Sequence, residues 1–376
     1  MNKLRLSARA KMFGVVLSLI IWPSNGGGRL AEAKLYFGPS NPPTRSSPLA
    51  LSSDDRFVWA VNRDNNSVSV IEVGNDLNQK VREIKVGAEP RSIALTPDRR
   101  KAYVTNMVAG TVSVINATTF QPTKAILVGT EPFGCALTPD GAKLYVANFM
   151  SDTVSVINTT TDQVIRTIPV PAGNPKPRAI AISADGKVYV TSFLARLRDD
   201  GRTIDQKEGR DDGKEGRVTV ISSTTDTVIG SVVLNPLADT GFLSNGSVLD
   251  RIPTTDPPTF TFTTGAFPNL LQGVAIKGGH AYVPNVGSSP NGPFRFNVNV
   301  QGLLCVIDTA TDVDAGLTLN MNRGVQFENV GEKLFNTTPI AIAFKQSAGE
   351  GFVVLGGTDR LVRVVLAADE IGRAHV

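Results

Sequence analysis

The chain has 376 residues, of which 41% are hydrophobic and 19% are charged, and its formal net charge is +4. This charge comes from the first 33 residues, where Glu32 is outnumbered by Lys3, Arg5, Arg9, Lys11 and Arg29. The remaining chain is neutral. It therefore lacks the clustered positive charge on which sequence-independent nucleic-acid binding depends, and we expect no nucleic-acid partner.

Residues 1–33 have the three sections of a secretory signal peptide. A basic start is followed by an apolar run from Met12 to Trp22 and by Ala31-Glu32-Ala33, a small-x-small cleavage site. The alternative is an uncleaved anchor, but the apolar run is shorter than the roughly 20 residues that span a bilayer. We predict cleavage after Ala33, an extracytoplasmic (periplasmic or secreted) mature chain, and no membrane span after cleavage.

From residue 34 onward the chain is organised around a repeat, seen most clearly from Ala102 to Ile115. Each unit opens with a Pro-led apolar run such as Pro90–Leu95. The strand Val-Ser-Val-Ile recurs at steps of 44 and 42 residues, beginning at Val68, Val112 and Val154. Four short strands in a unit of this length are typical of a propeller blade. We predict an all-β propeller of four-stranded antiparallel blades over residues 34–369, with about five complete blades and part of a sixth.

The repeat resembles that of the YVTN family of β-propellers, because Tyr103-Val104-Thr105-Asn106 spells the motif after which that family is named. The resemblance covers nearly all of the chain after residue 33. It implies the propeller fold and leaves the activity open, since surface-layer proteins, redox proteins and binding modules share such propellers. The loop Gly209–Thr219 and the segment Pro293–Val300 further resemble the N-terminal propeller half of secreted bacterial proteins whose later half binds c-type haem.

The last residues, 370–376, are expected to lie outside the fold. Ile371-Gly372-Arg373-Ala374-His375-Val376 is what a common sequencing adapter encodes when it is translated, so we set it aside as an artefact; a natural tail is the alternative. We expect a chain truncated in its sixth blade, with seven or so blades in the whole protein. Leu35-Tyr36-Phe37 would then complete the last blade.

Three insertions interrupt the repeat and are predicted to lie at one end of the propeller. Two of them follow second strands, after Ser192 and after Asn285, and the third, Asn235–Pro268, joins one blade to the next. Because strand direction alternates within a blade, both kinds of connection emerge on the same face. Long loops held on a rigid scaffold are where binding usually resides.

Arg91 and Arg178 are our candidate partner-binding residues at that end. Both stand at the starts of innermost strands, and a guanidinium offers fixed donors suited to carboxylate or phosphate groups. The expected partner is an acidic small molecule or a haem domain. The alternative is that each arginine bonds neighbouring carbonyls or a carboxylate such as Glu89 or Glu131.

The first insertion also raises the question of a metal site. Its candidate calcium ligands are Asp199, Asp200, Asp205, Asp211 and Asp212. The spacing does not fit an EF-hand, however, and basic residues match the acids in number between Arg196 and Arg217. We therefore favour a solvated loop that neutralises its own charge. In the second insertion, Phe294 and Phe296 are expected to cover a neighbouring loop rather than stack on a ligand.

The other recurring polar residues are interpreted as scaffold. Four asparagines share a position with Gly356, which suggests a turn near positive φ; they are Asn62, Asn106, Asn148 and Asn285. Four aspartates fall in tight turns between first and second strands, namely Asp54, Asp98, Asp140 and Asp185. His280 aligns with lysines beside an exposed turn, so we read it as a surface residue. Cys135 and Cys305 lie in different strands of separate blades, which favours two buried thiols over a disulfide.

The resemblance to haem proteins implies an extracytoplasmic scaffold for docking or electron transfer. Its c-type haem would belong to a downstream domain or a redox partner, because no C-x-x-C-H attachment motif occurs in the sequence. A lactonase-like enzyme acting at the channel mouth is one alternative, and a surface-layer or adhesion module is another. The enzyme needs convergent metal ligands or an acid/base pair, whereas the innermost strands offer arginines beside apolar residues. We lean against an enzyme and assign no catalytic or cofactor-binding residue.

Overall fold

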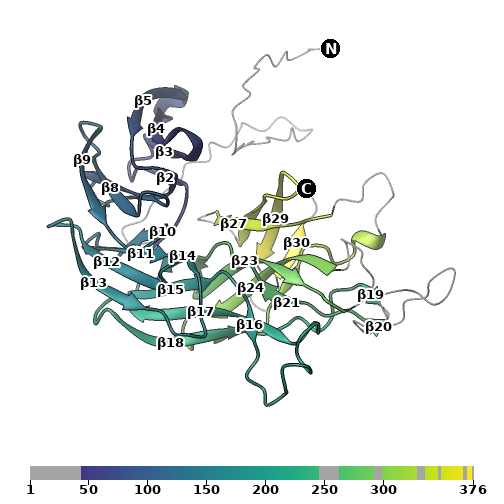
Figure 1. Ribbon diagram of the computed structural model, residues 1–376. Helices are drawn as coiled ribbons and strands as arrows, with labels where there is room; N and C mark the ends of the chain where they lie inside the picture. Colours follow the sequence, from purple (N-terminus) through teal and green to yellow (C-terminus); the bar gives the residue numbers. More distant parts are fainter. Residues whose placement is uncertain are drawn as a thin grey trace, which may run out of the picture. The chain divides into compact units, whose positions relative to one another are not determined.

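The computed structural model describes residues 44–244, 262–291, 299–327, 335–345, 349–366 and 371–374, which belong to one unit, Phe37–Val376. The described residues are almost entirely strands and turns, with 3-10 turns such as Arg63–Asn65 (η1). The predicted all-β propeller is confirmed, with six blades arranged in a ring (Figure 1). The signal-like segment, Leu35-Tyr36-Phe37 and the Phe294–Phe296 pair lie outside the described residues.

The first three blades follow the repeat without interruption, and neighbouring strands within each blade pair antiparallel. Blade 1 contains β2 (Leu49–Leu51), β3 (Phe57–Asn62), β4 (Ser67–Glu72) and β5 (Gln79–Lys85). Blade 2 contains β6 (Pro90–Leu95), β7 (Lys101–Asn106), β8 (Thr111–Asn116) and β9 (Gln121–Leu127). Blade 3 contains β10 (Pro132–Leu137), β11 (Lys143–Asn148), β12 (Thr153–Asn158) and β13 (Gln163–Pro169).

The next two blades carry the insertions. Blade 4 contains β14 (Pro177–Ile182), β15 (Lys187–Ser192), β17 (Lys214–Ser222) and β18 (Thr227–Leu234), with the short β16 (Arg196–Leu197) added on β17. Blade 5 is built on β23 (His280–Ser288) and β24 (Val300–Asp308), flanked by β21 (Phe267–Asn269), β22 (Ala275–Lys277), β25 (Val313–Asp314) and β26 (Leu319–Asn320). In the third insertion, β19 (Leu243–Ser244) pairs with β20 (Phe262–Thr263).

Blade 6 contains β27 (Pro339–Phe344), β28 (Glu350–Leu355), β29 (Arg360–Leu366) and β30 (Ile371–Ala374). The fourth strand of this blade, β30, pairs with β29 and is formed by residues that the sequence analysis attributes to an adapter. The last blade described is therefore four-stranded.

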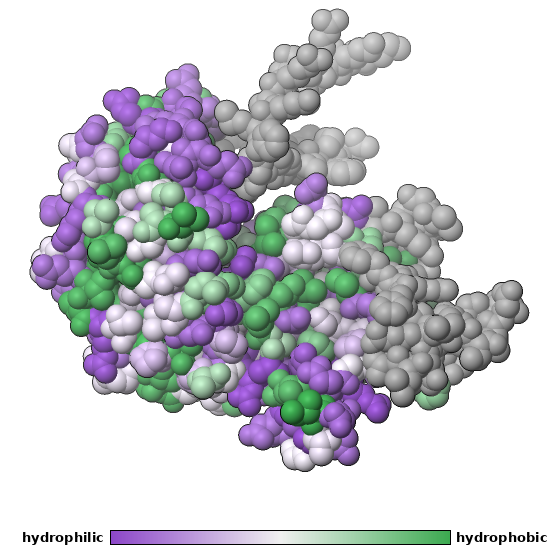
Figure 2. Space-filling model, in the orientation of Figure 1, coloured by the Kyte–Doolittle hydropathy of each residue, from purple (hydrophilic) through white to green (hydrophobic). Residues whose placement is uncertain are grey.

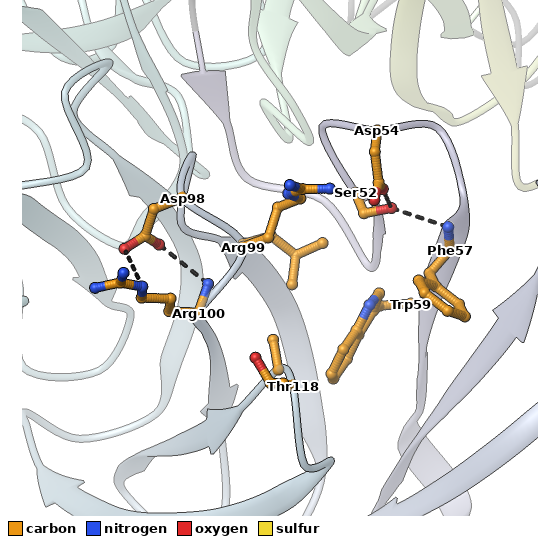
Figure 3. Close-up of a pocket in the computed structure, with 10 residues that line it drawn as sticks. Ser52, Asp54, Phe57, Trp59, Asp98, Arg99, Arg100 and Thr118 are labelled. Carbon is orange, nitrogen blue, oxygen red and sulfur yellow. Dashed lines mark hydrogen bonds and ion pairs between the residues drawn. The ribbon is translucent and has the colours of Figure 1, made fainter.

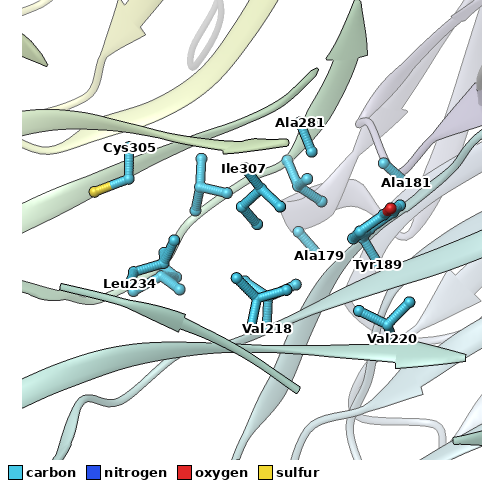
Figure 4. Packing of buried hydrophobic residues seen from close by; sticks show 13 residues of the cluster. Ala179, Ala181, Tyr189, Val218, Val220, Leu234, Ala281, Cys305 and Ile307 are labelled. Atoms are coloured by element: carbon cyan, nitrogen blue, oxygen red, sulfur yellow. The ribbon is translucent and has the colours of Figure 1, made fainter. Parts of the chain in front are cut away.

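The core consists of apolar clusters between neighbouring blades. Figure 4 shows the cluster between blades 4 and 5, where Val218 and Val220 of β17 pack with Ala281 and Ile307 across the interface. Equivalent clusters join blades 1 and 2, 2 and 3, 3 and 4, and 5 and 6. Within the described residues, none of these clusters joins blade 6 to blade 1.

A polar clamp beside each of three clusters explains the tyrosine of the repeat. The Tyr103 hydroxyl donates to Asp162 Oδ1 at 2.6 Å, and Lys101 Nζ lies 2.7 Å from Asp162 Oδ2. The same contacts recur one blade later, from Tyr145 and Lys143 to Asp226, and again from Tyr189 and Lys187 to Asp312. Burial and then the bonded aspartate raise the pKa of each tyrosine. Each clamp therefore ties the second strand of one blade to the next blade.

The repeated asparagines are scaffold, but the turn interpretation of them was wrong. Asn106 and Asn148 are fully buried at strand ends, and neither is among the described residues with positive φ. The Asn106 amide donates to the hydroxyls of Thr111 and Ser113 at 3.0 and 2.9 Å. The sheet register places Leu355, not Gly356, at the equivalent position of blade 6. Side-chain bonding across the hairpin, rather than backbone conformation, selects asparagine here.

The repeated aspartates do act in turns, as predicted. Asp98 Oδ1 accepts from the Thr96 hydroxyl at 2.6 Å and from the Arg100 backbone N–H at 3.0 Å. Asp140 makes the equivalent bonds to Thr138 and to the Ala142 backbone N–H. These bonds satisfy backbone N–H groups of the turns that have no partner within the β-sheets.

Residues 44–47 run along the innermost strands, an arrangement that the sequence did not predict. β1 (Thr44–Arg45) pairs antiparallel with β14. The backbone N–H of Ser46 donates to Ile180 O at 2.6 Å, and that of Ile93 donates to Ser47 O at 2.8 Å. These residues therefore bond to the innermost strands of blades 4 and 2 before the chain enters β2.

The two cysteines are buried and unpaired, as predicted. Burial raises the pKa of each thiol to about 12. Because only thiolates react readily, we expect the native protein at pH 8 to react negligibly with a thiol reagent such as dithionitrobenzoate. The same protein unfolded in guanidinium should release two equivalents, one for each cysteine. Rapid labelling of the native protein would contradict this burial.

Candidate functional site

The three insertions meet at one buried carboxylate. Asp211, in the first insertion, is 6% exposed. Its Oδ2 accepts from the backbone N–H of Gly265 in the third insertion at 2.9 Å, and its Oδ1 accepts from that of Asn291 in the second at 2.8 Å. The predicted crowding of all three insertions at one end is thus confirmed. Burial raises the pKa of Asp211 to about 7 despite the two donors.

The other acids of the first insertion are paired or solvent-facing. Arg202 bonds both Asp200 and Asp212, and Lys207 approaches Asp200 at 3.4 Å. Asp199 and Asp205 are exposed. Within the described residues no group of three or more potential metal ligands converges, so the five calcium candidates are not brought together. Figure 2 shows this loop as a largely hydrophilic projection.

The two candidate arginines have different surroundings. Arg91 pairs with Glu89 at 2.8 Å, which is the alternative stated above for this residue. The guanidinium carbon of Arg178 lies 4.0 Å from the ring centre of Phe133 and 4.5 Å from that of Phe193. Arg178 has no ion pair in the described part of the chain, and its Nε is buried without a partner.

Phe133 brings these two arginines together, because Arg91 lies 5.1 Å from the same ring. Desolvation, and then repulsion from Arg91, lowers the pKa of Arg178 to about 10. Phe149 extends the aromatic group, with its ring centre 5.7 Å from that of Phe193. These rings were not among the candidate residues predicted from the sequence, although Phe149 and Phe193 directly follow the second strands of blades 3 and 4.

A pocket of about 320 Å³ lies between blades 1 and 2 (Figure 3). It is lined by turns between first and second strands, so it opens at the end opposite the insertions. Phe57 and Trp59 occupy the positions that Lys101 and Tyr103 hold in blade 2, and Trp59 packs on Phe120 at 5.6 Å. Aromatic residues thus replace a clamp at this interface.

The described residues do not fit a haem held by this chain. His280 sits on a hairpin with Nδ1 3.2 Å from Gly278 O. Both cysteines are fully buried in the core, as is Met321, and the Met107 sulfur accepts from Arg91. The two cysteines lie in different core clusters, one between blades 2 and 3 and the other between blades 4 and 5, so they do not form a pair of axial ligands.

The fold and this end of the molecule define a repeat β-propeller whose three insertions are joined by hydrogen bonds at Asp211. A model of the YNCE-like beta-propeller family matches residues 100–232, and a model of the cytochrome D1 heme domain matches residues 46–133. These matches confirm the expected resemblance to repeat propellers. No curated protein matches the chain in sequence.

Solved propellers resemble the chain in fold. Hydrazine synthase of Kuenenia stuttgartiensis superposes with a TM-score of 0.62 and 19% identity, covering 84% of this chain and 75% of that one. The periplasmic gluconolactonase PpgL of Pseudomonas aeruginosa gives a TM-score of 0.53 and 15% identity, with coverages of 87% and 84%. At these identities the likeness shows the fold alone. The described residues form no helix that is long and apolar enough to cross a membrane.

Proposed function

We propose that this chain is an extracytoplasmic propeller scaffold that docks a haem-carrying domain or redox partner at the end bearing the insertions. The observation that carries the proposal is Arg178, a half-buried guanidinium held between Phe133 and Phe193 without an ion pair in the described chain. A buried charge is costly unless it is paired. An acidic group of a docked partner, such as a haem propionate or a surface carboxylate, would supply the missing charge.

The comparisons support a haem-associated role. The match to the cytochrome D1 heme domain model spans residues 46–133, a range that includes Arg91 and Phe133. The signal-like sequence of residues 1–33 supports an extracytoplasmic location. Since the described residues do not fit a haem, we assign the group to the partner.

The lactonase-like alternative has less support. The gluconolactonase neighbour shares the fold at 15% identity. The rings that pack on Arg178 are Phe133 and Phe193, and neither they nor Phe149 and the paired Arg91 beside them supply a metal ligand or an acid/base pair.

The test uses the chain from Lys34 and an acidic c-type cytochrome as the probe, with binding measured by interferometry at several salt concentrations. We expect Arg178→Ala to weaken binding roughly tenfold, because it removes a desolvated charge at the contact. The matched control is Arg166→Ala, which removes an exposed arginine of the outer strand β13. Equal affinity for wild type and Arg178→Ala would refute docking at this end.

A second arm uses haemin alone. We expect no saturable change in the haemin absorption spectrum with the wild-type chain. A Soret shift that Arg178→Ala abolishes would show that this chain holds the haem itself, contrary to the proposal.

A further inference from the structure

The start of the first insertion concentrates positive charge on one face of a two-stranded ladder. Arg196 of β16 pairs directly with Glu215 of β17, so their side chains share a face. Arg198 and Arg217 stand two residues from these partners and fall on the same face, because side chains alternate along a strand. Three guanidiniums therefore surround one carboxylate.

The contacts agree with this placement. Glu215 is 4% exposed and pairs with Arg217, while Arg198 Nε and Arg196 Nε lie 3.7 and 3.9 Å from its oxygens. The last two separations exceed a hydrogen bond. The Nε atoms of Arg198 and Arg217 are buried and lack a partner in the described structure. One carboxylate does not satisfy this set of donors.

Four of the remaining acids of the insertion are engaged elsewhere, and the other two, Asp199 and Asp205, are exposed. Asp200 and Asp212 bond Arg202, Glu208 lies 3.4 Å from Lys214, and Asp211 accepts two backbone N–H groups. The four residues Arg196, Arg198, Glu215 and Arg217, here called the arginine face, consequently carry a net charge of +2 in a partly buried setting. The side chains of Arg198 and Arg217 are 28% and 15% exposed.

The opposite side of the ladder is closed, so a ligand could contact the ladder only on the arginine face. A Cβ on Gly216 would lie 3.2 Å from side-chain atoms of Leu271 and Pro268, so that side packs on blade 5. On the arginine face, Arg196 lies against Gly173, where any side chain would collide with its guanidinium. A glycine therefore makes room for the charge.

We infer that the arginine face is a binding site for a tetrahedral oxyanion, a phosphate or sulfate group. Guanidinium forks match such oxygens in pairs, and an anion would satisfy the buried Nε donors that Glu215 leaves free. Arg178 is not one of the four residues of this site, and the inference does not rest on the docking proposal.

The test is calorimetric titration of the chain from Lys34 with inorganic phosphate, with sodium chloride and acetate titrated at matched ionic strength. We expect saturable binding of phosphate and none of acetate or chloride. A binding anion should also raise the thermal midpoint. Acetate binding as tight as phosphate binding, or no saturable phosphate binding, would overturn the inference.

Two variants predict opposite changes. Arg198→Ala should weaken phosphate binding roughly tenfold or more, since it removes charge-assisted bonds. Glu215→Gln removes the competing carboxylate and should strengthen it, even if the ligand-free variant is less stable. Arg166→Ala serves as the matched control and should bind like wild type. Unchanged affinity in Arg198→Ala, or weaker binding in a folded Glu215→Gln, would contradict the site.

Discussion

The variant Asp162→Asn is expected to lower the free energy of unfolding by about 2 to 3 kcal/mol. It removes the charge that accepts from Tyr103 and Lys101 between blades 2 and 3, and it leaves these groups with a poorer partner. Asparagine is chosen because Asp162 has φ of 53°, a conformation that asparagine tolerates better than alanine does. Urea unfolding of wild type and variant measures the difference.

The matched control is Asp359→Asn. Asp359 also has positive φ, at 49°, but it is exposed and forms no ion pair in the described structure. A combined Tyr103→Phe and Asp162→Asn variant should lose less than the sum of the single losses, because both substitutions break one contact. If Asp162→Asn costs no more than the control, the clamp does not stabilise the blade interface.

The contact between the tyrosine, the lysine and the aspartate of each clamp could have been predicted from the repeat. A Lys-x-Tyr in one unit precedes a Thr-x-x-Asp or Ser-x-x-Asp turn in the next at all three clamps, and blade 2 has Phe120 in place of the aspartate. This covariation between neighbouring units was available in the sequence. The strands themselves were predictable because β-branched periodicity and turn residues agree at each repeat.

The sequence predicts which end of the propeller carries the insertions, but it does not predict the side-chain contacts within them. Strand direction alternates within a blade, so the number of strands before a loop fixes the end from which that loop emerges. The acids and bases of the first insertion balance in number, yet three arginines share Glu215 while Asp211 bonds to backbone groups. Equal numbers of acidic and basic residues in the loop do not show which charges lie next to each other, because ion pairing depends on how the loop folds back on the ladder of β16 and β17.

Two other features had no local signal. Ser46 and Ser47 lie along innermost strands mainly through backbone bonds, which any residue could make; the Ser46 hydroxyl adds one bond by accepting from the Ile180 backbone N–H at 3.0 Å. Arg91 and Arg178 occupy equivalent repeat positions, yet Arg91 bonds Glu89 whereas Arg178 lies between two aromatic rings. The difference comes from neighbours in other strands, which spacing along the chain does not specify.

The joined insertions should loosen as pH rises, because the pKa of Asp211 is raised to about 7 from an ordinary value of 3.8. The folded state favours the protonated carboxyl, so its contribution is fully present below about pH 4 and is lost as pH rises through 7. Three pKa units correspond to at most about 4 kcal/mol. Hydrogen–deuterium exchange, corrected for the intrinsic rate, should show lower protection of the Gly265 and Asn291 amides at pH 8 than at pH 5.

The variant Asp211→Asn cannot ionise, so the protection of these two amides should become nearly independent of pH over this range. The control is Asp212→Asn. The charge of the exposed Asp212 is only a minor cause of the raised Asp211 pKa, so this variant should keep most of the pH dependence. Equal corrected protection at pH 5 and pH 8 in wild type would mean that Asp211 is already ionised, and that its two backbone donors outweigh its burial.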